Sequence, residues 1–129
     1  MRGEDEIEWL PAALHRQLVQ KELLSPAEAG ELNLQLWKIL RERTEPGGTV
    51  LPHTHDTAEI IHFTRGEVRA LLGEERTDCG PGDTLIVPAG AIHGVSNTAA
   101  GPSEQISFFI PEKGEENFGH TELEPDIEI

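Results

Sequence analysis

Short runs of β-favouring residues alternate with tight-turn signals along most of this chain. Each turn signal contains glycine, often beside proline: Pro46-Gly47-Gly48, Arg65-Gly66, Gly73, Gly80-Pro81-Gly82-Asp83, Pro88-Ala89-Gly90 and Ala100-Gly101-Pro102. No long helical pattern interrupts the runs between them. Short strands separated by such turns are typical of a sandwich or a barrel, so the sequence predicts an all-β fold.

The chain of 129 residues is long enough for one domain with a core and too short for two. We expect a β-barrel over residues 31–111, preceded by a helical extension over residues 1–30 and followed by an acidic tail over residues 112–129. The tail should drape over the barrel or stay mobile, because it carries few large apolar side chains.

The N-terminal extension contains leucines at four-residue spacing after a proline suited to a first helical position. They are Leu10, Leu14 and Leu18, with Pro11. This pattern predicts one short amphipathic helix over residues 10–24. Beyond it, Leu32, Leu34 and Leu36 alternate with polar residues or tryptophan, which predicts a strand from Glu31 to Arg43.

The charge of the chain excludes several classes of partner. Asp and Glu outnumber Lys and Arg by 24 to 10, for a formal net charge of -14. Such a field repels nucleic acids and anionic membranes. The first twenty residues do not resemble a secretory or transit peptide, and no apolar run is long enough to cross a membrane, so we expect a cytoplasmic protein.

Cys79 is the single cysteine, so the chain has no intramolecular disulfide and no thiolate cluster. Any bound metal must therefore be held by histidines and carboxylates. Alternate residues of a strand share a face, which places His53 and His55 together. Glu59 keeps that parity if the strand continues without a bulge, and Ile61 and Phe63 would then form an apolar floor.

His93 follows the turn Pro88-Ala89-Gly90, which can return its imidazole to the same interior. An unpaired carboxylate is costly inside a barrel, so His53, His55, Glu59 and His93 are hard to explain together without a metal ion.

The spacing of these residues resembles the two motifs of the cupin superfamily. In the first motif, glycine, five residues, His-x-His, three residues, glutamate, six residues and glycine are matched by Gly47, His53, His55, Glu59 and Gly66. In the second, glycine, five residues, Pro-x-Gly, two residues, histidine, three residues and asparagine are matched by Gly82, Pro88, Gly90, His93 and Asn97. The resemblance spans residues 47–97 without a departure.

The resemblance implies a jelly-roll barrel, also called a double-stranded β-helix, in a small single-domain protein. It also implies one divalent metal per chain on His53, His55, Glu59 and His93. The 15 residues between the motifs allow one hairpin turning near Gly73. The motif glycines and Pro88 should shape turns, and Asn97 should fix the turn after it rather than touch the metal.

Three imidazoles and one carboxylate suit Fe, Mn, Ni, Co or Zn, so the donors do not choose among these metals. Four protein ligands leave two positions on a six-coordinate ion, enough for a bidentate substrate or for a substrate with dioxygen. The favoured hypothesis is a dioxygenase-type oxidoreductase that acts on a small enolate, diketone or carboxylate. Glu59 would be a metal ligand or a catalytic base.

Three other hypotheses are compatible with the sequence. A redox-neutral isomerase, epimerase, cyclase or lyase would use the ion as a Lewis acid, although the lack of tyrosine disfavours cupins that depend on a tyrosine acid or base. A non-catalytic module would bind a small ligand, but no helix-turn-helix accompanies it. A barrel with an ancestral site would no longer bind metal.

The remaining candidate residues have lesser roles. His62 has the opposite parity to Glu59 and should face away from the cavity, while His15, His120 and Cys79 are expected to be bystanders. Gln35, Trp37 and Arg41 are left open as pocket residues, because their face is undetermined. We expect a homodimer, as sheet pairing protects strand edges, with Glu31 to Arg43 and the N-terminal helix as contributors.

Overall fold

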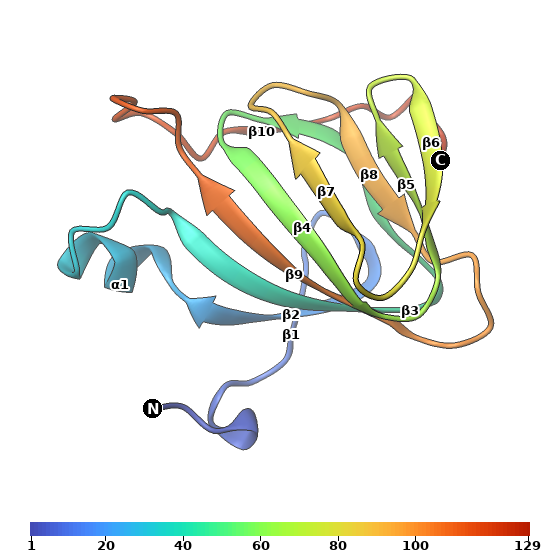
Figure 1. Cartoon of the computed structure of the whole chain (residues 1–129), viewed down its shortest axis with the longest axis horizontal. Helices are drawn as coiled ribbons and strands as arrows, with labels where there is room; N and C mark the ends of the chain where they lie inside the picture. Colours follow the sequence, from blue (N-terminus) through green and yellow to red (C-terminus); the bar gives the residue numbers. More distant parts are fainter.

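The computed structural model describes residues 1–129, and nearly all of its regular structure is β-strand (Figure 1). The strands are β1 (Leu10–Pro11), β2 (Arg16–Leu24), β3 (Lys38–His55), β4 (Ala58–Arg65), β5 (Val68–Leu72), β6 (Glu75–Cys79), β7 (Thr84–Val87), β8 (His93–Ser96), β9 (Ser103–Ile110) and β10 (Thr121–Leu123). The helical segments are η1 (Glu4–Glu6) and α1 (Pro26–Glu31). The prediction of an all-β fold is confirmed.

The long strand β3 organises the fold, because its two halves have different neighbours. Residues Lys38 to Thr44 pair with β9 on one side and with β2 on the other. The half that ends at His55 pairs with β8 and β10, and with β2 only at Thr49. The main path of the sheet runs β6-β5-β8-β3-β9-β4-β7 and curls into an open barrel (Figure 1).

The core lies inside this curl, where alternate side chains of the strands meet. Ile61 and Phe63 of β4 are 1% and 2% exposed, and they pack with Val50 of β3, Val87 of β7 and Val95 of β8. The apolar floor expected beneath Glu59 is therefore present.

The tight turns fall where the glycines predict them. Gly66 joins β4 to β5 with a φ of +80°, and a Cβ there would lie 2.5 Å from the carbonyl oxygen of Pro102. Only glycine fits both conditions. The hairpin between the motifs is β5–β6, and it turns at Gly73 as expected.

The helix expected over residues 10–24 is wrong, because most of this segment is the nine-residue strand β2. It pairs antiparallel with β3 from Arg16 to Leu24, with a register shift near each end of the pairing. The leucine spacing fits a helix, but Leu18 is buried by sheet pairing instead, at 3% exposure. Tertiary pairing has overridden a weak local preference.

The strand expected from Glu31 begins later, at Lys38. The segment before it contains the short helix α1, which Ser25 and Glu28 start with a reciprocal capping box. Asn33 then takes a left-handed φ of 55°, and Leu32 and Leu34 stay exposed. The alternation of leucines in this segment is therefore not a buried strand face.

The acidic tail drapes over the barrel, one of the two outcomes expected for it. Its strand β10 pairs with the end of β3, so that Leu123 lies opposite His53 and Thr121 opposite His55. Neither helical segment has the length and apolarity that crossing a lipid bilayer requires.

Candidate metal centre

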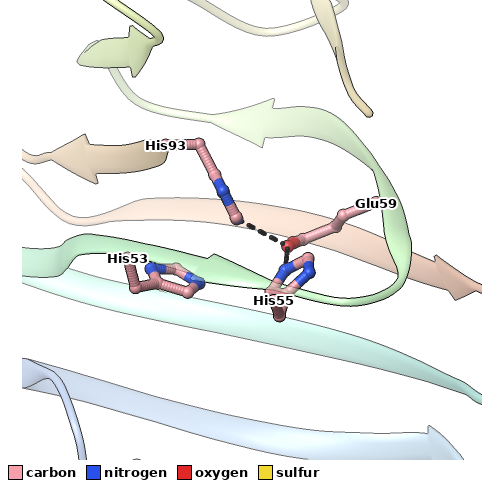
Figure 2. Close-up of side chains that lie close together, drawn as sticks. All are labelled: His53, His55, Glu59 and His93. Atoms are coloured by element: carbon pink, nitrogen blue, oxygen red, sulfur yellow. Dashed lines mark hydrogen bonds and ion pairs between the residues drawn. The ribbon is translucent and has the colours of Figure 1, made fainter. Parts of the chain in front are cut away.

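Four buried side chains converge inside the barrel (Figure 2). His53 and His55 come from β3, Glu59 from β4 and His93 from β8. Each offers one ligand atom, and these four atoms lie within 4.8 Å of one another. The structure thus brings together all four residues that the sequence nominated.

The backbone fixes the tautomer of each imidazole. The Nδ1 atom of His53 lies 2.6 Å from the carbonyl oxygen of Leu51. The Nδ1 atoms of His55 and His93 lie 2.8 Å and 3.0 Å from the carbonyl oxygens of Thr57 and Ala91. A carbonyl can only accept, so each Nδ1 must donate its proton. The lone pair of each neutral ring is then on Nε2, where an outer hydrogen bond of this kind orients a metal ligand.

Glu59 lies between two of these rings. Its Oε1 atom is 2.9 Å from Nε2 of His55 and 3.2 Å from Nε2 of His93 (Figure 2). Burial opposes the charged carboxylate, but the hydrogen bonds that the two histidines donate from Nε2 when their rings are cationic outweigh it and hold the pKa of Glu59 well below its usual range. The carboxylate is therefore an anion in the interior of the barrel.

Burial acts in the other direction on His53. It combines with the nearby His93 to lower the pKa of His53 to about 3, so this ring is neutral at physiological pH. Burial also disfavours charge on His55, but Glu59 outweighs it and raises the pKa of that ring. An anionic carboxylate among imidazoles whose Nε2 atoms face it is a donor set that fits a divalent transition metal.

A bulge in β3 decides which way the first two histidines face. Leu40, Glu42 and Val50 are buried at even positions, whereas His53 and His55 are buried at odd ones. Against β8, Val50 pairs with Val95 and His53 pairs with His93, so β3 carries one more residue than its partner in this interval. The extra residue reverses the parity of the strand and turns both imidazoles inward.

Leu51 and Pro52 form this bulge, opposite Gly94. Pro52 has no N–H to contribute to the ladder, which suits a bulge. A Cβ on Gly94 would lie 2.8 Å from the carbonyl oxygen of Val50, so the close approach requires glycine. The freed backbone groups of Leu51 bond to histidines: the amide donates to Nδ1 of His15 at 3.0 Å, and the carbonyl accepts from His53.

Glu59 reaches the site differently from the expectation. The strand does not continue through it, because β3 ends at His55 and β4 begins at Ala58 after a short bend. In β4, Glu59 pairs with Phe109 of β9 on one side and with Val87 of β7 on the other. The convergence is as predicted, but a change of strand produces it.

A cavity of about 260 Å³ opens beside two of the four residues. His53 and His55 line it together with Trp37, Lys38, Glu42 and Phe109. The two imidazoles therefore face space in which a small molecule could approach an ion held by the site.

Comparison with known proteins places the chain in a family. The cupin domain model matches residues 40–109, which is more than half of the chain. The chain belongs to the cupin domain family. None of the curated proteins compared with this cupin matches it significantly in sequence.

Many solved structures share the fold, at low sequence identity. A cupin-2 domain protein from Rhodospirillum rubrum is 16% identical with a TM-score of 0.78, over 98% of this chain and 80% of that one. A predicted oxalate decarboxylase from Thermotoga maritima is 20% identical with a TM-score of 0.72, over 81% and 91% of the two chains. The polyketide cyclase RemF from Streptomyces resistomycificus is 13% identical with a TM-score of 0.76, over 95% and 83%.

Two residues in the cavity of this cupin were missed by the sequence analysis. His15 was set aside as a helix residue, but its ring centroid lies 5.2 Å from that of His53. Burial lowers the pKa of His15 to about 4. No spacing signal linked it to the motifs, because β2 approaches β3 only through the sheet.

Glu42 is the second missed residue. It is 5% exposed, and its Oε1 atom accepts hydrogen bonds from Ser107 Oγ at 3.1 Å and from Gln105 Nε2 at 3.4 Å. Burial and the charge of Glu59 raise the pKa of Glu42 to about 7. Its even parity with Leu40 was the signal that could have placed it inside.

The three residues left open have separate positions. Trp37 lines the cavity. Gln35 lies in a different hollow, beside Pro111 and the tail. Arg41 points the other way and forms ion pairs with Glu104 at 2.6 Å and with Glu4 at 2.8 Å.

Apart from His15, the expected bystanders lie away from the cavity. Nδ1 of His62 lies 2.8 Å from Thr84 Oγ1, away from the cavity, and His120 is exposed beside Glu122. Cys79 is buried, and burial raises the pKa of its thiol. Asn97 Nδ2 donates to the carbonyls of Thr44 and Gly101, which fixes the adjoining turn.

Proposed function

We propose that this cupin is a metal-dependent enzyme of the dioxygenase type that acts on a small chelating enolate, diketone or carboxylate. The observation that carries the proposal is the convergence of His53, His55, Glu59 and His93 beside a cavity. A divalent Fe, Mn, Ni, Co or Zn ion at this site would supply Lewis acidity and, for a redox-active metal, electrons for reaction with oxygen.

The protein's own contribution is to hold the donors rigid. Backbone carbonyls accept the Nδ1–H groups of His53, His55 and His93, so the Nε2 atoms keep their direction. Glu59 is a permanent anion that would offset part of the charge of the ion. Four protein donors leave room for a chelating substrate on the cavity side, which His53 and His55 line.

A second candidate is a redox-neutral isomerase, cyclase or lyase. Glu42 favours it, because a buried carboxyl group with a pKa of about 7 in the cavity is suited to moving protons. The chain has no tyrosine to serve as an acid or base, and Glu42 could take that role. Relatives in fold include a polyketide cyclase and a predicted oxalate decarboxylase, which is a lyase, so the redox-neutral class has precedent on this barrel.

Metal analysis and oxygen uptake test the proposal together. Protein purified without chelators should contain about one divalent metal per chain, and the iron, manganese and nickel forms should be assayed with a panel of enolates, diketones and small acids. Substrate-dependent oxygen uptake supports the dioxygenase. Equal turnover with and without oxygen favours the redox-neutral enzyme, and stoichiometric binding without turnover under any metal indicates a ligand-binding module.

A further inference from the structure

Lys38 is the first residue of β3 and lines the same cavity as His53 and His55. Its Nζ atom lies 4.3 Å from the centroid of the Trp37 ring and 4.8 Å from that of Phe109. The two rings hold the ammonium group by cation–π contacts. These contacts leave its N–H groups free to donate hydrogen bonds to an oxygen atom.

Lys38 lacks an ion-pair partner in a chain that is rich in acids. With 24 acidic residues available, Lys21, Arg41, Arg65 and most other cations lie within 4 Å of a carboxylate. The cations without such a partner are Arg16, Arg76, Lys113 and Lys38, and only Lys38 among them is not exposed. The carboxylates of Glu42, Glu22 and Glu59 act on it only from beyond that distance.

The sheet register places this cation close to the candidate metal site. Lys38 pairs with Phe109 of β9, and Phe109 pairs in turn with Glu59 of β4. Directly paired residues share a face, so the ammonium group and the ligand carboxylate stand on the same inner face with one strand between them.

His15 adds a neutral donor to the wall of the cavity. Its Nδ1 atom accepts the amide hydrogen of Leu51, so the proton of the neutral ring is on Nε2. That N–H makes no hydrogen bond within the protein, and no buried side-chain nitrogen or oxygen lacks a partner, so it is accessible to a ligand.

We propose that the cavity binds a small acid by two ends, a chelating end at the metal site and a carboxylate that pairs with Lys38. This inference rests on the proposed function, because the chelating end needs a metal on His53, His55, Glu59 and His93. A cavity of about 260 Å³ limits the ligand to a few carbon atoms between its two ends. Lys38 is thus the residue that selects a diacid over a monoacid.

Malate and 2-hydroxybutyrate are a matched pair of probes. Both carry the same chelating hydroxy-carboxylate, but malate ends in a second carboxylate where 2-hydroxybutyrate ends in a methyl group. The chain contains two tryptophans, so Trp9→Phe leaves Trp37, which touches Lys38, as the single fluorescent reporter. Titrations of the cobalt-loaded full chain then give binding constants from Trp37 emission and from the cobalt absorption spectrum.

Malate should bind about 10-fold more tightly than 2-hydroxybutyrate. Lys38→Met, which keeps the stem over the aromatic rings, should remove this preference, and Lys38→Arg should restore most of it. Lys113→Met removes an equal charge from the exposed tail and should leave the preference unchanged. Equal affinities for the two acids, or a preference that survives Lys38→Met, would overturn the inference while the metal-dependent function stands.

A chain that takes up no cobalt would contradict the proposed function instead. The titration of Trp37 emission with malate still decides the role of Lys38 in that case. Binding that Lys38→Met abolishes supports an acid site at Lys38, and no malate binding overturns it.

Discussion

The backbone amide of Gly90 donates a hydrogen bond of 2.9 Å to the carbonyl oxygen of His55. This bond ties the turn that precedes His93 to the strand that carries the other two imidazoles. Gly90 has a φ of +80°, in the left-handed region that side chains disfavour. One glycine therefore connects the two sequence motifs at the metal site.

Gly90→Ala should weaken both stability and metal binding. The left-handed backbone costs alanine about 1–2 kcal/mol, measurable by urea unfolding, and relaxation of the turn should displace His93. We expect metal affinity to fall about 10- to 100-fold, as for loss of a group that orients a ligand. Gly82→Ala is the control, because Gly82 has a φ of +94° in open space at the turn between β6 and β7 and bonds to no ligand residue, and it should lose stability but not metal.

Replacing His53 and His55 together by alanine should abolish metal binding. Two of four donors are then missing, and elemental analysis of the purified protein should find no stoichiometric metal. His62→Ala is the matched control, because His62 bonds to Thr84 on the opposite face of β4. Metal retained by the double variant would contradict the assignment, as would metal lost from the control.

Glu42 should make stability depend on pH in a definite direction. Its pKa rises from 4.5 to about 7 on folding, so the folded state holds a proton that the unfolded state releases between these values. The contribution of Glu42 is present below the unfolded pKa and is lost as pH rises towards 7. Glu42→Gln removes this loss. As pH rises, the free energy of unfolding of the variant should therefore increase relative to that of wild type, by at most about 1.4 kcal/mol per pH unit.

Urea titrations of chelator-treated protein between pH 5 and 7 measure this slope. Glu104→Gln is the control, because burial opposes its charge but hydrogen bonds from Arg41 and Arg65 lower the pKa of Glu104 overall. Its contribution is lost only as pH falls below the unfolded pKa, so its difference from wild type should be flat in this window. Parallel curves for Glu42→Gln and wild type would contradict the role of Glu42.

The homodimer remains a prediction, and the outer face of the sheet indicates where to test it. Ile39, Phe108, Ile60 and Ile86 lie in one register row across β3, β9, β4 and β7, and Ile86 is 67% exposed. A second copy packed on this apolar row would bury it. Ile86→Glu should then halve the mass measured by light scattering, whereas Leu34→Glu, outside the row, should not; a monomeric wild type would refute the dimer.

The metal-site residues could be predicted because their geometry follows from short motifs. His53 and His55 are two apart and share a face in any extended strand, and the spacing of Pro88, Gly90 and His93 defines a turn that local chemistry determines. These properties do not depend on distant parts of the chain. The turns at Gly66 and Gly73 could be predicted for the same reason.

The N-terminal segment and the cavity could not be predicted, because sheet partners decide them. Leu18 fits a helical pattern equally well, and only its pairing opposite Thr44 makes it a strand residue. Alternation puts Lys38 and Glu42 on one face of β3 with Leu40, but the curl of the whole sheet decides that this face is the inner one. Nothing in the neighbouring sequence of His15 shows that a bulged backbone 36 residues later will donate to it.

The family motif records only that the ligand residues are present. The bulge at Leu51 and Pro52 decides whether His53 and His55 face the interior of the barrel. If Leu51 and Pro52 paired regularly instead of bulging, simple alternation after Val50 would turn His53 and His55 towards the outside of the sheet. The apolar core and every ligand residue would remain in the sequence. A substitution of Pro52 or Gly94 that straightens the strand is thus an evolutionary route by which a barrel of this kind loses its metal while its histidines still match the motif residue for residue.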